Sequence, residues 1–120
     1  MNRLLYLAII IIAIVFITSI GTSVAESSPR RGTIEYRKTI IRKVFGKHGR
    51  DAIKIAYCES GIRPWASNGQ YKGIFQMGSH ERKTYGHGSG TWAQARAAKK
   101  YFVASGSSWG PWECKYVLYS

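Results

Sequence analysis

Apolar side chains recur at the three- and four-residue spacing of an α-helix in three stretches of the chain. These are residues 34–45, a segment that begins near 50–51, and residues 92–105. Such spacing places the apolar side chains on one face of each helix. Gly46, Gly61 and Gly106 follow the three stretches, and glycine commonly stands just beyond a helix C-terminus. The pattern therefore predicts three amphipathic helices that end at glycines.

The sequence also predicts the starts and some of the buried side chains of the second and third helices. In the second, Asp51 lies in the first turn, where a negative charge is favourable, and the expected apolar face consists of Ala52, Ile53, Ala56 and Tyr57. In the third, Thr91 is the expected N-cap. Trp92, which follows it, is expected in the core.

The segments between these helices are rich in glycine. Residues 61–73 contain Pro64 and three glycines and are predicted to be loop or irregular strand. Residues 73–77 are expected to open a short helix that runs into residues 79–82. Another glycine-rich loop spans residues 86–90, and an aromatic tail follows the last helix. The predicted fold class is mainly α.

The N-terminus has the pattern of an export signal. Arg3 precedes an unbroken apolar run at residues 4–17, and Ser23-Val24-Ala25 follows. A basic start, a short apolar run and a small-x-small site predict a signal peptide over residues 1–25. An uncleaved membrane anchor is the alternative, although the run is shorter than the about 20 residues of a spanning helix. Residues 26–33 are expected to be a flexible lead-in and residues 34–120 the domain.

The charge of the chain is strongly one-sided, with 18 basic against 6 acidic residues and a net charge of +12. Such a balance favours a polyanionic environment. Four tryptophans among many basic residues are compatible with a nucleic-acid stacking platform, but no helix-turn-helix, RNA-recognition or zinc-finger motif is present. Because the chain is expected to be exported, anionic polymers of a bacterial wall are the expected partner and nucleic acid is not.

The sequence contains two cysteines, Cys58 and Cys114. An even number in an exported chain suggests a disulfide, which would close a loop of about 57 residues and stabilise the fold by about 4 kcal/mol on a chain-entropy model. Two free thiols and a partial metal site are the alternatives. No histidine lies at metal-ligand spacing from either cysteine, so we reject the metal site.

Glu59 is the candidate for chemistry. It lies in the last turn of a mainly apolar predicted helix. Both the helix dipole and desolvation should raise the pKa of a carboxyl there, and a general acid needs a raised pKa near neutral pH. The alternative is a surface glutamate paired with Arg63 or Lys54. From the residues alone this alternative is favoured, because most glutamates are solvated.

The segment around Glu59 resembles a known catalytic motif. Glu59-Ser60-Gly61, Pro64, Ala66 and residues 73–76 (Gly-Ile-Phe-Gln) are similar to the Glu-Ser…Pro…Ala…Gly-Leu-Met/Phe-Gln motif of soluble lytic transglycosylases. The Asn-Ala-Gly segment typical of that family is replaced here by Ala104-Ser105-Gly106. This departure favours a shorter branch of related enzymes.

That branch is the catalytic domain of resuscitation-promoting factors, small secreted actinobacterial enzymes that cleave peptidoglycan. Cys58 directly before Glu59, and the ending Trp-Gly-Pro-Trp-Glu-Cys at 109–114, resemble this domain. In it, the cysteine before the catalytic glutamate pairs with a cysteine after a Trp-Gly-x-Trp segment. The resemblance covers roughly residues 50 to 115, although the segment 80–82 (His-Glu-Arg) departs from it.

The resemblance implies a small lysozyme-like α fold in which Glu59 is the single acid/base for the β-1,4 bond between N-acetylmuramic acid and N-acetylglucosamine. Either the muramyl 6-hydroxyl or a water would complete the reaction. A retaining glycosidase would need a second carboxylate about 5 Å away. Asp51, about two turns back, is poorly placed for this, and Glu81 is a speculative helper whose alternative is a surface charge.

The same resemblance implies a set of substrate-binding residues. Gln76 would bind sugar hydroxyls or an acetamido group, and Ser60 would orient Glu59 or the substrate, with a helix cap as its alternative. Tyr71 and Tyr101 would line the groove, although Tyr101 could equally pack in the core. Trp109 and Trp112 could pack on the disulfide or border the cleft. No histidine is given a catalytic role.

The sequence thus predicts a secreted, wall-associated, monomeric enzyme that needs no cofactor or metal and does not stay inserted in a membrane after signal cleavage. Two other functions remain open. One is a non-catalytic module that binds wall glycan. The other is a cationic secreted protein that acts on membranes or nucleic acid.

Overall fold

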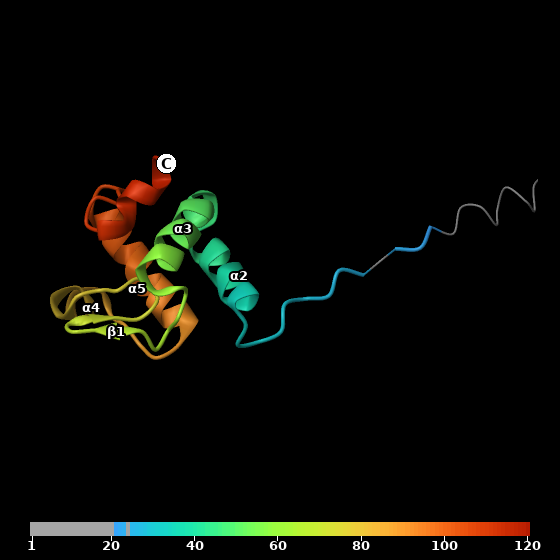
Figure 1. Ribbon diagram of the computed structural model, residues 1–120, viewed down its shortest axis with the longest axis horizontal. Coiled ribbons are helices and arrows are strands. Elements are labelled where there is room, and N and C mark those ends of the chain that lie inside the picture. Colours follow the sequence, from blue (N-terminus) through green and yellow to red (C-terminus); the bar gives the residue numbers. More distant parts are fainter. Residues whose placement is uncertain (1–20, 24) are drawn as a thin grey trace, which may run out of the picture.

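The computed structural model describes residues 21–23 and 25–120, so most of the predicted signal peptide lies outside the described residues. Residues 25–32 are exposed and lead away from the helical body without regular secondary structure (Figure 1). Within the described part of the chain, no helix has both the length and the apolar character needed to cross a membrane.

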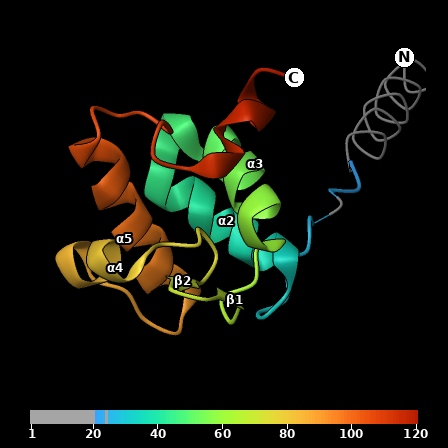
Figure 2. The same cartoon turned by 60° about the vertical axis from the view of Figure 1, so that its left-hand side comes forward.

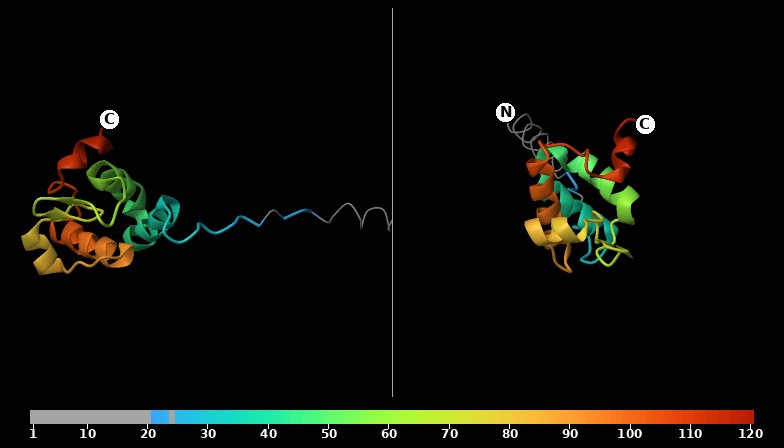
Figure 3. Two further views of the ribbon diagram at one scale, coloured as in Figure 1. Left: turned by 60° about the horizontal axis from the view of Figure 1, so that its bottom comes forward. Right: turned by 90° about the vertical axis from the view of Figure 1, so that its left-hand side faces the viewer.

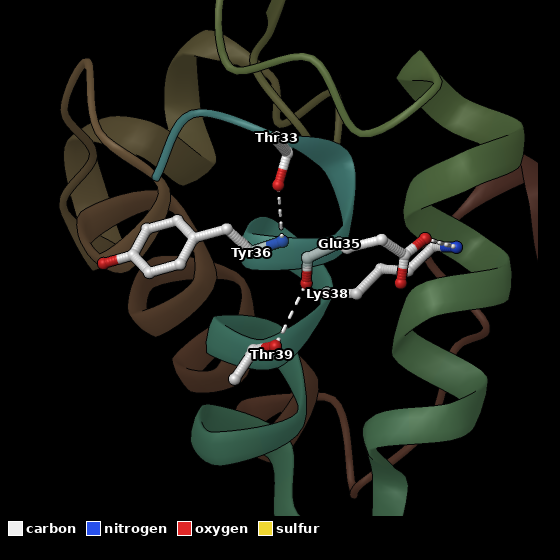
Figure 4. Close-up of polar contacts among 5 residues, drawn as sticks. All are labelled: Thr33, Glu35, Tyr36, Lys38 and Thr39. Atoms are coloured by element: carbon white, nitrogen blue, oxygen red, sulfur yellow. Dashed lines mark hydrogen bonds and ion pairs between the residues drawn. The ribbon is translucent and has the colours of Figure 1, made fainter. Parts of the chain in front are cut away.

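Helix α2 (Ile34–Phe45) has the predicted bounds. At its start, the Thr33 hydroxyl accepts a hydrogen bond from the backbone N–H of Tyr36 at 3.2 Å, as Figure 4 shows. This bond satisfies one of the free N–H groups of the first turn. Lys38 pairs with Glu35 at 2.9 Å one turn along the helix. At the other end, Gly46 takes a φ of 57°, a backbone conformation that ends the helix.

Helix α3 (Gly49–Ser60) follows a short 3₁₀-helix, η1 (Gly46–His48), and ends at Gly61 in the left-handed conformation. The predicted end is therefore correct, but the predicted apolar face is only half right. Ala52 and Ala56 are buried, whereas Tyr57 is 63% exposed and the fully buried Ile55 replaces it. The helix has apolar side chains on more than one face, and only packing against α2 and the tail selects the buried one.

The middle of the chain forms a small hairpin of β1 (Ser67–Asn68) and β2 (Tyr71–Lys72), with Ser67 opposite Lys72. It is followed by a tight turn and then helix α4 (Ser79–Tyr85). The prediction that residues 73–77 open a helix is wrong. Gly73 has a φ of 81° and Gln76 a φ of 47°, and these left-handed conformations cannot continue a right-handed helix.

Helix α5 (Thr91–Ala104) is preceded by Gly90 as its N-cap, without a capping side chain. Thr91 is therefore the first helical residue and not the predicted cap. Trp92 is also not in the core, because it is 40% exposed, with the Arg96 guanidinium 5.7 Å from its ring centroid. The chain ends in a second 3₁₀-helix, η2 (Glu113–Leu118).

The helices surround an aromatic core. Helix α2 packs against both α3 and α5, and η2 packs on α3; Figure 2 shows the hairpin and α4 on one side of this body and η2 on another. Phe45, Phe75, Phe102 and Trp109 are buried with ring centroids 4.5–6.0 Å apart along their contacts. The predicted mainly α class is confirmed.

A buried amide ties the irregular middle to this core. The side chain of Gln94 in α5 accepts a hydrogen bond from the Ile74 N–H at 2.8 Å and donates to the carbonyls of Pro64 and Gly88 at 2.9 and 2.7 Å. Gly73 lies so close that a Cβ there would meet the Gln94 Oε1 at 2.5 Å. The turn that carries Gln76 is thereby held against α5. Figure 3 shows α4, which follows this turn, beside α5.

Candidate active site

A disulfide joins Cys58 to Cys114, with 6.0 Å between their Cα atoms. The prediction of this bridge is confirmed, and the structure describes no free cysteine in residues 25–120. The bridge connects the last turn of α3 to the start of η2, two segments 56 residues apart in sequence. The Tyr116 hydroxyl lies 3.5 Å from the Cys58 sulfur. The end of α3 is therefore held against the tail by a covalent link.

Glu59 lies next to this bridge, and its Oε1 accepts a hydrogen bond from the backbone N–H of Cys114 at 3.1 Å. Partial burial raises the pKa of Glu59, the Cys114 bond opposes this shift, and the negative charge of Glu113 adds to it. The alternative of a salt-bridged surface residue does not describe this carboxyl. In the part of the chain that the structure describes, the ion pair between Glu35 and Lys38 is the only one.

The Glu59 side chain opens onto a cavity of about 600 Å³. The cavity wall is contributed by the end of α3, the hairpin, the turn after it, α4, α5 and the residues around Cys114. Three carboxyl groups line it, those of Glu59, Glu81 and Glu113. Among the described residues, no three histidine, cysteine or acidic side chains are grouped so that they could hold a metal ion.

Four of the five predicted substrate-binding residues line this cavity, namely Gln76, Tyr71, Tyr101 and Glu81. The fifth, Ser60, is buried and does not line it. Its hydroxyl donates to the carbonyls of Ala56 and Ile74, at 3.2 and 2.7 Å, and accepts from the Arg63 N–H. Ser60 thus joins the end of α3 to the turn after the hairpin. This role is structural and is close to the helix-cap alternative that the sequence left open for Ser60.

Gln76 is held in place by its own turn. Its side-chain nitrogen donates to the Gly73 carbonyl at 2.9 Å, so the amide oxygen is the group left to meet a ligand. The hairpin beside it is tied to α4, because the Arg82 guanidinium donates to the carbonyls of both Gln70 and Met77. Gln76 has a positive φ, which is a strained backbone conformation for this residue type. Two sets of contacts stabilise this conformation, namely the bond of Gln76 to Gly73 and the bonds of Arg82 to the hairpin and Met77.

Tyr101 and Trp112 form an aromatic wall of the cavity. Their ring centroids are 4.9 Å apart, and Tyr101 also stacks on Tyr85 at 5.3 Å. The Trp112 indole N–H donates to the Phe75 carbonyl at 3.0 Å. Tyr101 thus both packs on its neighbours and lines the cavity. Trp109 is buried, whereas Trp112 is buried and also forms part of the cavity wall.

Several other residues of this wall are not predicted by the sequence. Glu113 is one, and Asn68, Gln70 and His80 also line the cavity. A signal for Glu113 was available, because a disulfide between Cys58 and Cys114 brings their neighbours Glu59 and Glu113 to the same place. The polar hairpin residues gave no such signal, since their position depends on how the loop folds.

The arrangement can deliver a proton from a half-buried carboxyl to a ligand bound between aromatic and polar walls. Glu59 stands at a helix C-terminus, where the dipole disfavours ionisation, and Tyr71, Tyr101 and Gln76 surround the space in front of it. No family model, no curated protein and no solved structure matches this chain.

Proposed function

We propose that the protein is a secreted glycosidase or lytic transglycosylase that cleaves the β-1,4 bond between N-acetylmuramic acid and N-acetylglucosamine in peptidoglycan. The observation that carries the proposal is the Glu59 carboxyl, half-buried on the wall of a cavity with a raised pKa. A protonated carboxyl in such a place is what protonation of a glycosidic oxygen requires.

The resemblance to lytic transglycosylases and resuscitation-promoting factors supports the choice of substrate and a lysozyme-like fold. The motif residues that carry it converge at one place. Glu59 and Gln76 both line the cavity, and the Cys58–Cys114 bridge borders it. The aromatic side chains of Tyr71 and Tyr101 provide faces suited to sugar rings, and Gln76 provides an amide for their substituents.

In the proposed reaction, Glu59 gives its proton to the departing glycosidic oxygen as the C–O bond breaks. The resulting carboxylate then takes a proton from the group that attacks the anomeric carbon. If that group is the muramyl 6-hydroxyl, the product is a 1,6-anhydro sugar; if it is water, the product is a reducing end. Glu81 of α4 also lines the cavity and would act as a helper that holds the attacking water for the Glu59 carboxylate.

A group of exposed basic residues supports association with an anionic wall. Arg42, Lys43, Lys47 and Arg50 lie where α2, η1 and α3 meet, and we name them the basic corner. All four are exposed. Phosphodiester polymers of a bacterial wall provide the charge that such a surface attracts.

The function is tested by incubating the purified protein with peptidoglycan and measuring soluble muropeptides. Release by the wild type and by Glu35→Gln, a surface control, with no release by Glu59→Gln, is the expected result. Equal release by Glu59→Gln would refute the proposal, and binding without release by the wild type would show a non-catalytic module. Mass spectrometry of the ends distinguishes the anhydro product from the hydrolytic one.

A cationic membrane-active protein makes a different prediction in the same assay. Its activity would survive Glu59→Gln and would fall steeply as salt rises, because it depends on charge and not on one carboxyl.

A further inference from the structure

Glu113 occupies a place for which the proposed reaction has no role. It is the first residue of η2 and directly precedes Cys114. The disulfide holds Cys114 against Cys58, and the Cys114 N–H binds the Glu59 Oε1 at 3.1 Å. Both carboxyl-bearing side chains, Glu59 and Glu113, line the same cavity. The position of Glu113 relative to Glu59 is therefore set by a covalent bridge and a hydrogen bond.

Two opposing effects act on the pKa of Glu59, and the charge of Glu113 contributes to one of them. The hydrogen bond from Cys114 stabilises the ionised form of Glu59, which lowers its pKa. A proton donor must instead stay protonated until it reacts. Burial works in that direction, and so does the negative charge of Glu113. A like charge nearby disfavours ionisation of a carboxyl.

Of the ionisable groups around the cavity, Glu113 is the one whose charge shifts the pKa of Glu59. Those that line it, besides the two glutamates, are Tyr71 of the hairpin, His80 and Glu81 of α4, and Tyr101 of α5. No lysine or arginine lines the cavity as described.

The nearest cations by sequence are directed to carbonyl groups. The Lys115 ammonium donates to the Gly110 carbonyl at 3.1 Å, and the Arg63 guanidinium donates to that of Ser60 at 2.6 Å. Neither is ion-paired with Glu113, since the one ion pair of the described chain lies in α2. In the part of the chain that the structure describes, neither Glu59 nor Glu113 therefore has a salt-bridge partner that would neutralise its charge.

We propose that Glu113 is a positioning residue of the site, held beside Glu59 by the disulfide, whose carboxylate disfavours ionisation of Glu59 and so extends its action as a proton donor toward neutral pH. The inference rests on the proposed function for its catalytic meaning. Glu113 would act through its charge and need not touch the substrate. In this it differs from the second carboxylate of a retaining glycosidase, which attacks the sugar as a nucleophile.

The direction of the effect follows from the charge. A donor works only while protonated, so the rate falls as the pH rises through the pKa of Glu59. In Glu113→Gln, that pKa is lower, and the fall begins at a lower pH. On the falling limb, we expect the activity to be about two- to five-fold below wild type, as befits a partly exposed charge pair. At acid pH, where Glu59 is protonated in both proteins, the activities should agree.

The experiment compares the full chain with Glu113→Gln, Glu113→Asp and the control Asp51→Asn. The pH profile of kcat/KM is measured with peptidoglycan, and the Glu59 carboxyl is titrated by carbon NMR, assigned by its absence in Glu59→Gln. Glu113→Gln should lower the midpoint in both measurements, Glu113→Asp should restore it, and Asp51→Asn should leave it unchanged. An unaltered NMR midpoint in Glu113→Gln refutes the inference.

The two proposals can fail separately. If the wild type releases no muropeptide, the glycosidase function fails, while the NMR titration still shows whether Glu113 controls Glu59. If the wild type is active but Glu113→Gln loses activity equally at every pH, Glu113 has a structural role and the inference is wrong. Thermal melting of each variant identifies that case.

Discussion

The two ends of helix α3 present opposite chemistry. Its first turn carries Arg50 of the basic corner, and its last turn carries Glu59 and opens onto the cavity. At 1.5 Å per residue the two ends are about 15 Å apart. Three of the six acidic residues of the chain line the cavity. The net charge of +12 therefore conceals a local region of the opposite sign.

The helix dipole acts on both ends. At the start of α3 its partial positive charge adds to the positive potential of Arg50, and Arg42 and Lys43 lie in the last turn of α2, where the dipole favours cations. Asp51 is the acidic residue in that first turn. At the end of α3 the partial negative charge disfavours ionisation of Glu59 and adds to the effect of burial. One element thus supports an anion-attracting surface and a proton donor.

The largest expected effect comes from removing the carboxyl at the cavity end. Glu59→Gln keeps the shape and can still accept the Cys114 hydrogen bond, but it cannot donate a catalytic proton. We expect peptidoglycan cleavage to fall by about 10² to 10⁴-fold, measured as muropeptide release, with binding to wall fragments retained. Loss of binding together with activity would instead indicate a damaged fold.

Breaking the bridge should have the next largest effect, on stability. In the pair Cys58→Ser and Cys114→Ser, the chain loses a link across 56 residues, worth about 4 kcal/mol on the chain-entropy model. Urea or thermal unfolding by circular dichroism checks this, with reduction of the wild type as the parallel test. If melting is the same with and without a reductant, the bridge does not contribute to stability.

A smaller effect is expected at the other end of α3. Replacing Arg42, Lys43, Lys47 and Arg50 by glutamine should weaken binding to a soluble poly(glycerol phosphate) about tenfold at low salt, and less at high salt. The matched control changes two arginines and two lysines that are exposed elsewhere, Arg30, Arg31, Lys83 and Lys100. If both sets weaken binding equally, the net charge matters and the basic corner does not.

The smallest effect concerns the pH dependence of stability. Because the folded state raises the pKa of Glu59, the folded protein binds the proton more tightly than the unfolded chain. Stability therefore falls as the pH rises from the unfolded to the folded pKa. At neutral pH, the melting temperature of Glu59→Gln should be slightly higher than that of the wild type. At pH values well below the folded and unfolded pKa of Glu59, the two melting temperatures should be equal. A lower melting temperature of the variant at neutral pH would contradict this.

Much of the fold could be predicted because helix ends depend on local sequence. Gly46 ends α2 and Gly61 ends α3, through interactions with backbone groups a few residues away. The errors lie where distant contacts decide. Tyr57 is exposed because α3 buries Ile55 in its place. Residues 73–76 form a turn and not a helix, and a hydrogen bond from the Ile74 N–H to Gln94 of α5 holds this turn in place.

The candidate site shows the same division. Glu59, Gln76, Tyr71, Tyr101 and Glu81 were named from the sequence, and all five line one cavity. Their proposed roles remain predictions. Ser60 lies in the backbone hydrogen-bond network instead, because its neighbours in space come from a segment fourteen residues away.

The sequence by itself determined the helical class, the ends of α2 and α3 at Gly46 and Gly61, and the two cysteines available for a bridge, since these depend on residue type and short-range spacing. Only the tertiary structure decided which face of α3 is buried, and that Glu59, Glu81 and Glu113 share one cavity. Electrostatic interaction between carboxyls depends on distance and burial. Packing sets both between two segments that are 56 positions apart in the sequence, at Cys58 and Cys114, and no local pattern encodes them.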